Sequence, residues 1–219
     1  MENNITIGMD LGDQSHVVVV MDEKGNEVEM KSIRNTENSL RKFFSDYNNA
    51  TVAIEAGTHS PWISRLLKEI GCTVYVGNPR KLRIIWDSCD KSDQRDARIL
   101  AMVCRVEPRL LWPIQHRDRQ AYADLGVIKA RDALIRNRVR LITHIRSVTK
   151  TCGCRIPKCS TGSFSKRAPE YIPSELKSCL EPLISTVDQL TQQVKELNRQ
   201  INRLCKRYPE TEKLLKVPG

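Results

Sequence analysis

The stretch that decides the fold is Ile5-Thr6-Ile7-Gly8-Met9-Asp10-Leu11-Gly12, followed closely by His16-Val17-Val18-Val19-Val20-Met21. Both runs are rich in β-branched residues, which favour strands. The turn between them, Gly12-Asp13-Gln14, is too short for a crossover connection, so the two strands are expected to be antiparallel. A third strand is expected over residues 27–33, after the turn Lys24-Gly25-Asn26. The chain is therefore expected to begin with an antiparallel meander of three strands.

Helices and strands alternate over the rest of the first hundred residues. The pattern predicts helices over residues 36–47, 60–70 and 92–106, and strands over residues 51–55 and 72–76. Pro61 in the first turn of the second helix and Gly71 just past its end follow the usual start and stop preferences of helices. The order β-β-β-α-β-α-β predicts an α/β fold with a mixed five-stranded sheet and flanking helices. This is the order of the ribonuclease H fold.

Beyond Pro113 the strand signals stop and long helical patterns replace them. We expect helices over about residues 117–150 and 174–208, separated by an irregular segment over residues 151–173 that is rich in Cys, Gly, Ser and Pro. The second helix carries the seam of a left-handed coiled coil, made of Leu176, Leu180, Leu183, Val187, Leu190, Val194, Leu197, Ile201 and Leu204. The first helix carries a matching stripe. The two are expected to pair as a coiled-coil hairpin, between chains, or both, which gives domains over residues 1–112 and 113–210.

Composition narrows the class of protein. The 219 residues have a mean hydropathy of −0.44, and the longest apolar run, Val17 to Met21, is far too short to cross a bilayer. The N-terminus lacks the pattern of a secretory signal, so the protein is expected in the cytosol, with its eight cysteines as free thiols. The net charge of +10 is uneven: residues 1–100 carry 13 basic and 15 acidic side chains, and residues 101–219 carry 23 and 11. The basic half is expected to bind a polyanion.

Four carboxylates are candidates for a metal site. Asp10 and Glu55 each end an apolar strand, where an unused carboxylate would be costly. Asp93 and Asp96 are spaced i, i+3 at the start of a helix and share one face. Oxygen donors of this kind suit Mg²⁺ or Mn²⁺, and two such ions can promote phosphodiester cleavage. The alternative interpretation is that the two helical aspartates only favour the helix N-terminus. The residues alone also leave open the pair Asp87 and Asp90, which has the same spacing.

Three blocks of this sequence resemble the signature of the DEDD transposases of the insertion sequence one-ten family, which are also called bridge-RNA-guided recombinases. The blocks are Ile7-Gly8-Met9-Asp10-Leu11-Gly12, Ala53-Ile54-Glu55-Ala56-Gly57 and Lys91-Ser92-Asp93-Gln94-Arg95-Asp96-Ala97, in the order and spacing of the family. The helical hairpin and the ending Leu214-Leu215-Lys216-Val217-Pro218-Gly219 also resemble it. The resemblance covers essentially the whole chain, but only the N-terminal half of the family's proteins.

This resemblance implies a RuvC-like domain in which Asp10, Glu55, Asp93 and Asp96 bind Mg²⁺ and form the catalytic tetrad. In the family, a serine of a C-terminal transposase domain completes the site and attacks DNA, while a structured guide RNA pairs with target and donor DNA. Residues 211–219 would be the start of that domain, so this chain alone is not expected to carry out full recombination. The family also implies a bacterial or archaeal protein that assembles as a homodimer or tetramer through its coiled coil.

The first long helix is strongly basic, an observation that does not depend on the family resemblance. Between Leu125 and Lys150 there is one acid, Asp132, and seven basic residues: Lys129, Arg131, Arg136, Arg138, Arg140, Arg146 and Lys150. A solvated face normally mixes the two signs, so phosphate binding is the favoured interpretation. Cys152, Cys154 and Cys159 do not have the spacing of a zinc knuckle, and His16, His59 and His116 are predicted to be ordinary surface or turn histidines.

Three other functions compete with the recombinase. An ATPase of the actin type is disfavoured because 219 residues cannot supply two lobes and no second glycine-rich phosphate loop occurs. A stand-alone nuclease of the Holliday-junction-resolving kind would share the acidic site and use water as the nucleophile. A non-catalytic dimerisation module that binds nucleic acid would need only the basic helix and the heptads. A test of nucleotide binding distinguishes the ATPase from the other functions. Metal-dependent cleavage by this chain alone distinguishes the stand-alone nuclease from the non-catalytic module.

Overall fold

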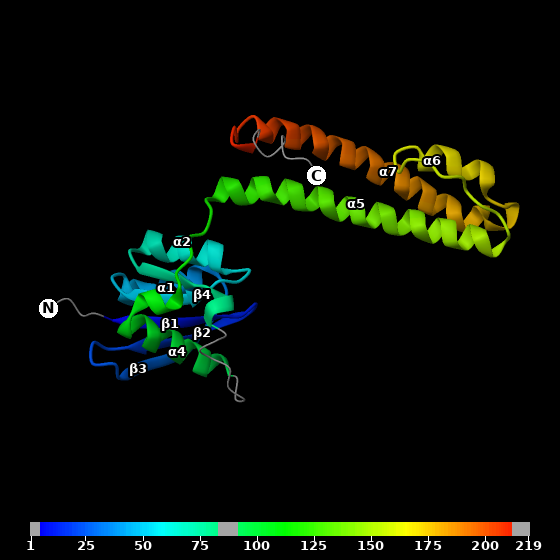
Figure 1. Cartoon of the computed structure of the whole chain (residues 1–219). Coiled ribbons are helices and arrows are strands. Elements are labelled where there is room, and N and C mark those ends of the chain that lie inside the picture. The colour runs from blue at the N-terminus through cyan, green and yellow to red at the C-terminus, as the bar shows by residue number, and fades with distance from the viewer. Residues whose placement is uncertain (1–4, 83–91, 212–219) are drawn as a thin grey trace. The chain divides into compact units, whose positions relative to one another are not determined.

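The computed structural model describes residues 5–82 and 92–211, which form two compact units, Met1–Arg117 and Asp118–Gly219 (Figure 1). Asp87, Asp90 and Cys89 lie outside the described residues, as does the ending Leu214 to Gly219. In the part of the chain that is described, no helix is both long and apolar enough to cross a bilayer. The seven described cysteines are all free thiols.

The first unit is built on a mixed five-stranded sheet (Figure 1). Its strands are β1 (Thr6–Leu11), β2 (Ser15–Met21), β3 (Glu27–Arg34), β4 (Thr51–Glu55) and β5 (Thr73–Gly77). Their order in the sheet is β3-β2-β1-β4-β5; β1 runs antiparallel to β2, β2 runs antiparallel to β3, and β4 runs parallel to both β1 and β5. The predicted meander and the ribonuclease H order are confirmed.

Helices cover both faces of this sheet. The helices of the first unit are α1 (Glu37–Phe44), α2 (Ser60–Ile70), α3 (Pro79–Leu82) and α4 (Asp93–Val106), with 3-10 turns at η1 (Ser45–Tyr47) and η2 (Pro108–Leu111). Side chains of α1 and α2 share the main apolar core with the face of the sheet that carries Ile7 and Met9. Helix α4 packs through Ala97 and Ala101 on the opposite face, where Val19 lies. Because strand residues alternate between faces, the two cores stay separate.

Local sequence signals account for where these helices begin and end. The Thr36 side chain accepts a hydrogen bond from the Ser39 backbone N–H at the start of α1, and Ser92 accepts one from Arg95 at the start of α4. Gly71 ends α2 with φ at 112°, a left-handed conformation that glycine adopts at little cost. The sequence did not predict α3 or η2. Residues 113–117, which we expected in the hairpin, belong to the first unit, where the Ile114 N–H donates to the Val76 carbonyl over 2.9 Å.

The second unit is a helical hairpin, as predicted (Figure 1). Helices α5 (Arg119–Thr151) and α7 (Ser174–Cys205) are antiparallel, since Arg131 bonds to Asn198 and Arg138 bonds to Thr191. The segment between them is not wholly irregular, because it holds α6 (Phe164–Arg167) and η3 (Ala168–Tyr171). The buried core lies toward this connection and includes Ile142, Ile145, Phe164, Leu180 and Val187. The ring of Phe164 is buried in that core, so the connection packs against both long helices.

The predicted heptad seam is buried on one side only. Leu180, Val187 and Val194 are buried, as are the adjacent Ile184 and Thr191, whereas Leu183, Leu190 and Leu197 are only partly covered. At the open end of the hairpin, Asp124 accepts hydrogen bonds from Gln120 and from the Tyr208 hydroxyl, and forms an ion pair with Arg207 over 3.2 Å. These polar contacts join the start of α5 to the end of the α7 region, where few apolar side chains are buried.

Candidate active site

The sheet brings two of the four predicted carboxylates together. In the parallel pair β1 and β4, Gly8 lies opposite Ala53, and Asp10 and Glu55 stand two residues further along their strands. Residues two apart point to the same face of a strand. Ala53 packs in a core with Leu100 of α4, so Asp10 and Glu55 belong to the face that α4 covers. The two acids therefore sit side by side at one end of the sheet.

Helix α4 comes unusually close to β1 at Gly8. A Cβ atom built on Gly8 would lie 1.9 Å from the Ala97 carbonyl oxygen and 2.5 Å from the Ala101 backbone nitrogen. Only glycine allows a helix backbone to rest on a strand in this way. Ser92 caps the same helix, and its first turn carries Asp93 and Asp96. Because α4 packs closely on β1 at Gly8, Asp93 and Asp96 in the first turn of α4 lie near the end of β1.

The electrostatics of Asp10 show that all four acids are neighbours. Burial, followed by the negative charges of Asp93, Asp96 and Glu55 in that order, raises the pKa of Asp10 from 3.8 to about 6. Asp10 and Glu55 are partly buried, as is Asp96, whereas Asp93 is exposed. Two further elements, β4 and α4, thus contribute carboxylates that act electrostatically on Asp10, and the role of the four acids as one metal site stays a prediction.

The donor set fits a hard divalent cation. All four groups are carboxylates, the ligands that Mg²⁺ and Mn²⁺ prefer. A bound cation would remove the repulsion that raises the pKa of Asp10. The four side chains do not have the spacing of metal ligands in this structure. Within residues 5–82 and 92–211, no three His, Cys, Asp or Glu groups stand close enough to hold one ion. Cys152, Cys154 and Cys159 form no such group either.

A histidine network borders the same end of the sheet. Trp62 Nε1 donates to His59 Nδ1 over 3.4 Å, so the neutral His59 carries its proton on Nε2, which lies 3.2 Å from Asp13 Oδ1.

His16 was predicted to be a surface or turn residue, and this is wrong, because its side chain is fully buried on β2. Burial lowers the pKa of His16. His116 bonds to Ser60 across 2.8 Å, which holds residues 113–117 to α2.

The seven basic residues of α5 divide into two groups. Arg131, Arg138 and Arg146 are partly buried and donate to groups within the hairpin. The other four are exposed: Lys129, Arg136, Arg140 and Lys150. Among these, Arg136 forms an ion pair with Asp132 over 2.9 Å on the same helix. The exposed group is the part of α5 that can meet a phosphate backbone without rearrangement of the hairpin.

Arg146 is the residue that fastens the connection to α5. Its guanidinium donates to the Ile156 carbonyl over 2.7 Å and to the Pro157 carbonyl over 3.1 Å, and lies 5.2 Å from the centroid of the Phe164 ring. The planar guanidinium donates to two carbonyl groups while it packs on an aromatic ring. The ammonium group of lysine lacks this planar geometry.

We expect Arg146→Ala to lower the free energy of unfolding of the hairpin by about 2–3 kcal/mol, because two carbonyl groups lose charged donors. Arg146→Lys should recover less than half of this loss. Urea unfolding followed by helical circular dichroism measures the change, with the exposed Arg140→Ala as the matched control, expected within about 0.5 kcal/mol of wild type. Equal effects of Arg146→Ala and Arg140→Ala would contradict this role.

Comparison with known proteins agrees with the geometry. The model of the DEDD transposases of the insertion sequence one-ten family, described as a transposase, matches residues 7–152. No curated protein matches the chain. Among solved structures, RuvC of Thermus thermophilus is similar with a TM-score of 0.34 and 11% identity, over 47% of this chain and 96% of that one. The family match extends from β1 to the end of α5 and includes all four carboxylates. The chain belongs to the DEDD transposases of the insertion sequence one-ten family.

Proposed function

We propose that this chain supplies the metal-dependent site of a DNA transposase, which cleaves and exchanges DNA strands of a mobile insertion sequence. The observation that carries the proposal is the placement of Asp10 and Glu55 at neighbouring strand ends, beside the helix that rests on Gly8 and carries Asp93 and Asp96 in its first turn. A protein does not gather four carboxylates at a sheet end for stability, because their mutual repulsion opposes folding. The family makes nucleic acid the substrate, and the acidic site is where its phosphate would be cleaved.

Each residue of the site has a distinct part in this proposal. Asp10 and Glu55, fixed on neighbouring strands, would hold Mg²⁺ or Mn²⁺ from the sheet side, and Asp93 and Asp96 would hold it from the helix side. The bound ions supply Lewis acidity and stabilise charge on the phosphate oxygens. Asp10, whose charged form is disfavoured by burial and by the neighbouring acids, would bind the cation in its ionised state.

The nucleophile and the guide are part of the same proposal. The family resemblance implies that the attacking group is a serine from a further domain and that a structured RNA selects the DNA. The exposed basic residues Lys129, Arg136, Arg140 and Lys150 support binding of DNA or of such an RNA through its backbone. The partly covered Leu183, Leu190 and Leu197 support association of hairpins into a dimer or tetramer. We propose that the protein acts in the cytoplasm of a bacterium or archaeon.

A thermal shift experiment tests the metal site. Mn²⁺ or Mg²⁺ at about one hundred times its dissociation constant should stabilise the first unit by about 2.7 kcal/mol. The double variant Asp10→Asn with Glu55→Gln should lose this gain, whereas Glu23→Gln, an exposed acid of the same unit, should keep it. Equal stabilisation of the double variant and the wild type would show that the metal binds elsewhere.

A cleavage assay then separates the competing functions. Branched DNA incubated with the chain and Mn²⁺ should stay uncut if the nucleophile is a serine of another domain. Cutting that depends on Asp10 would identify a stand-alone nuclease that uses water. A chain that binds nucleic acid but gains no stability from metal would be a non-catalytic module.

A further inference from the structure

Strand β3 forms one edge of the sheet, and among the described residues no strand pairs with its outer side. An edge strand directs alternate N–H and C=O groups outward, which allows another strand to add to it. Two of its apolar side chains are exposed: Val28 by 58% and Met30 by 41%. The edge therefore offers both unpaired backbone and uncovered apolar surface.

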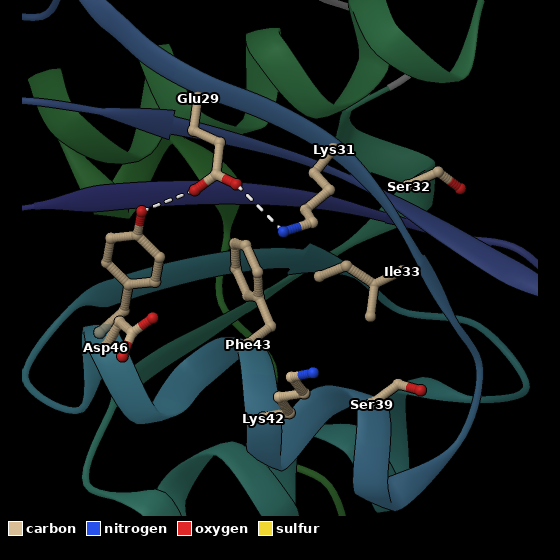
Figure 2. A pocket seen from close by; sticks show the side chains of 9 residues that line it. Glu29, Lys31, Ser32, Ile33, Ser39, Lys42, Phe43 and Asp46 are labelled. Atoms are coloured by element: carbon tan, nitrogen blue, oxygen red, sulfur yellow. Dashed lines mark hydrogen bonds and ion pairs between the residues drawn. The ribbon is translucent and has the colours of Figure 1, made fainter.

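A hollow of about 330 Å³ lies beside this edge, between β3 and the α1–η1 segment (Figure 2). Phe43 and Ile33 form its apolar part, and Glu29, Lys31, Lys42 and Asp46 supply its charges. Figure 2 shows the side chains of Glu29 and Lys31 joined by an ion pair on β3, with the Phe43 ring between β3 and α1. Lys31 Nζ lies 3.5 Å from Glu29 Oε1 and 5.7 Å from the centroid of the Phe43 ring. A strand added to β3 would direct alternate side chains into this hollow.

The charges along β3 are complementary to those of a second β3 in the opposite direction. The strand reads Glu27-Val28-Glu29-Met30-Lys31-Ser32-Ile33-Arg34. In an antiparallel pair centred on Met30, each Glu29 would face the Lys31 of the other copy, and the two Met30 side chains would meet on the opposite face. Charges on an edge strand usually prevent pairing with unrelated strands. Here the same charges become attractive pairs when the strand meets its own copy, since opposite charges across strands stabilise a sheet.

We propose that β3 pairs with β3 of a second copy of this chain, antiparallel and two-fold symmetric about Met30, so that two five-stranded sheets join into one. Lys31 from the second copy enters the hollow between Glu29 and Asp46, and completes a charged cluster that each copy alone leaves open to solvent. Met30 loses its exposure on the other face. This contact is independent of the hairpin and of the metal site.

Disulfide trapping tests the register. In the full chain with Cys89, Cys152 and Cys179 replaced by Ser, Met30→Cys should form a disulfide-linked dimer on mild oxidation, because position 30 meets itself at the two-fold axis. Val28→Cys is the matched control: the side chain is more exposed, but it lies two residues from the two-fold axis, where the β3 register is irregular, so its two copies do not meet. Trapping at position 28 that equals or exceeds trapping at position 30 would overturn the proposal, as would the absence of a dimer at position 30.

Charge reversal tests the pairing itself. Adding Glu29→Lys to the Met30→Cys chain places two like-charged pairs across the strands and should lower the yield of dimer about tenfold at low salt. The swap Glu29→Lys with Lys31→Glu restores the complementary pairs and should restore the yield. The swap still lacks the hydrogen bond from the Tyr47 hydroxyl to Glu29, so recovery cannot come from that contact. A swap that traps no better than Glu29→Lys alone would contradict the pairing.

Discussion

Without divalent metal at pH 7.5, the first unit of the Asp10→Asn variant should unfold about 10 °C above that of the wild type. The folded pKa of Asp10, about 6, lies above its unfolded value of 3.8, so folding favours the protonated acid. Ionisation of this single group therefore costs the folded wild type up to roughly 3 kcal/mol as the pH rises from about 4 to above 6. The asparagine side chain stays neutral at every pH. The stability that Asp10→Asn gains over the wild type is therefore absent at pH 4 and complete above pH 7.

Tryptophan fluorescence follows this transition selectively, because Trp62, Trp86 and Trp112 all fall within residues 1–117. The exposed Glu23→Gln is the control, with a small shift that is the same at pH 4 and pH 7.5. Saturating Mg²⁺ should reverse the order of the two proteins, since the wild type gains a ligand that the variant binds weakly. A variant that is no more stable than the wild type at neutral pH would show that the four acids do not repel one another as described.

The second large effect concerns salt. The wild type should bind duplex DNA with a slope of log K against log salt of about −4 to −6, at roughly 0.9 per phosphate neutralised. Replacing the exposed residues Lys129, Arg136, Arg140 and Lys150 with Gln should make the slope shallower by about three to four units, equally for unrelated sequences. Structured RNA should compete with DNA in the same way. Fluorescence anisotropy across a salt series measures each slope.

Arg131→Gln is the matched control on the same helix. Its guanidinium donates to Asn198 Oδ1 over 2.7 Å, so it serves the hairpin and should leave the salt slope unchanged while lowering stability. If the quadruple variant kept the wild-type slope and affinity for DNA and RNA, the exposed face of α5 would be only a solvated surface.

The sheet was predictable because its local signals agree with its packing. The β-branched run Val17 to Val20 favours a strand, and Thr36 and Gly71 mark helix ends by chemistry that does not depend on the rest of the chain. Proximity of Asp10 to Glu55 follows from parallel pairing of β1 with β4, which the element order predicts.

Other features depend on contacts that a sequence pattern does not contain. Arg136 and Arg138 are two residues apart, yet only Arg138 meets Thr191, because the rotation of α5 against α7 decides which arginines are covered. His16 is buried because β2 lies inside the sheet. The short helix at Phe164 forms where its ring closes the hairpin core, a tertiary effect that overrides the turn-rich composition of the segment.

The contact at Gly8 changes how related sequences should be searched for a working site. An acid at the end of the first strand and an Asp-x-x-Asp helix start are common enough to occur by chance. Their carboxylates can share one cation only if the helix backbone touches the strand, and a methyl group two residues before the first acid would hold it away. A chain that keeps all four acids but carries a larger residue at this position is expected to be a folded relative that has lost its metal. The glycine is thus as diagnostic of the proposed metal site as any of its four carboxylates.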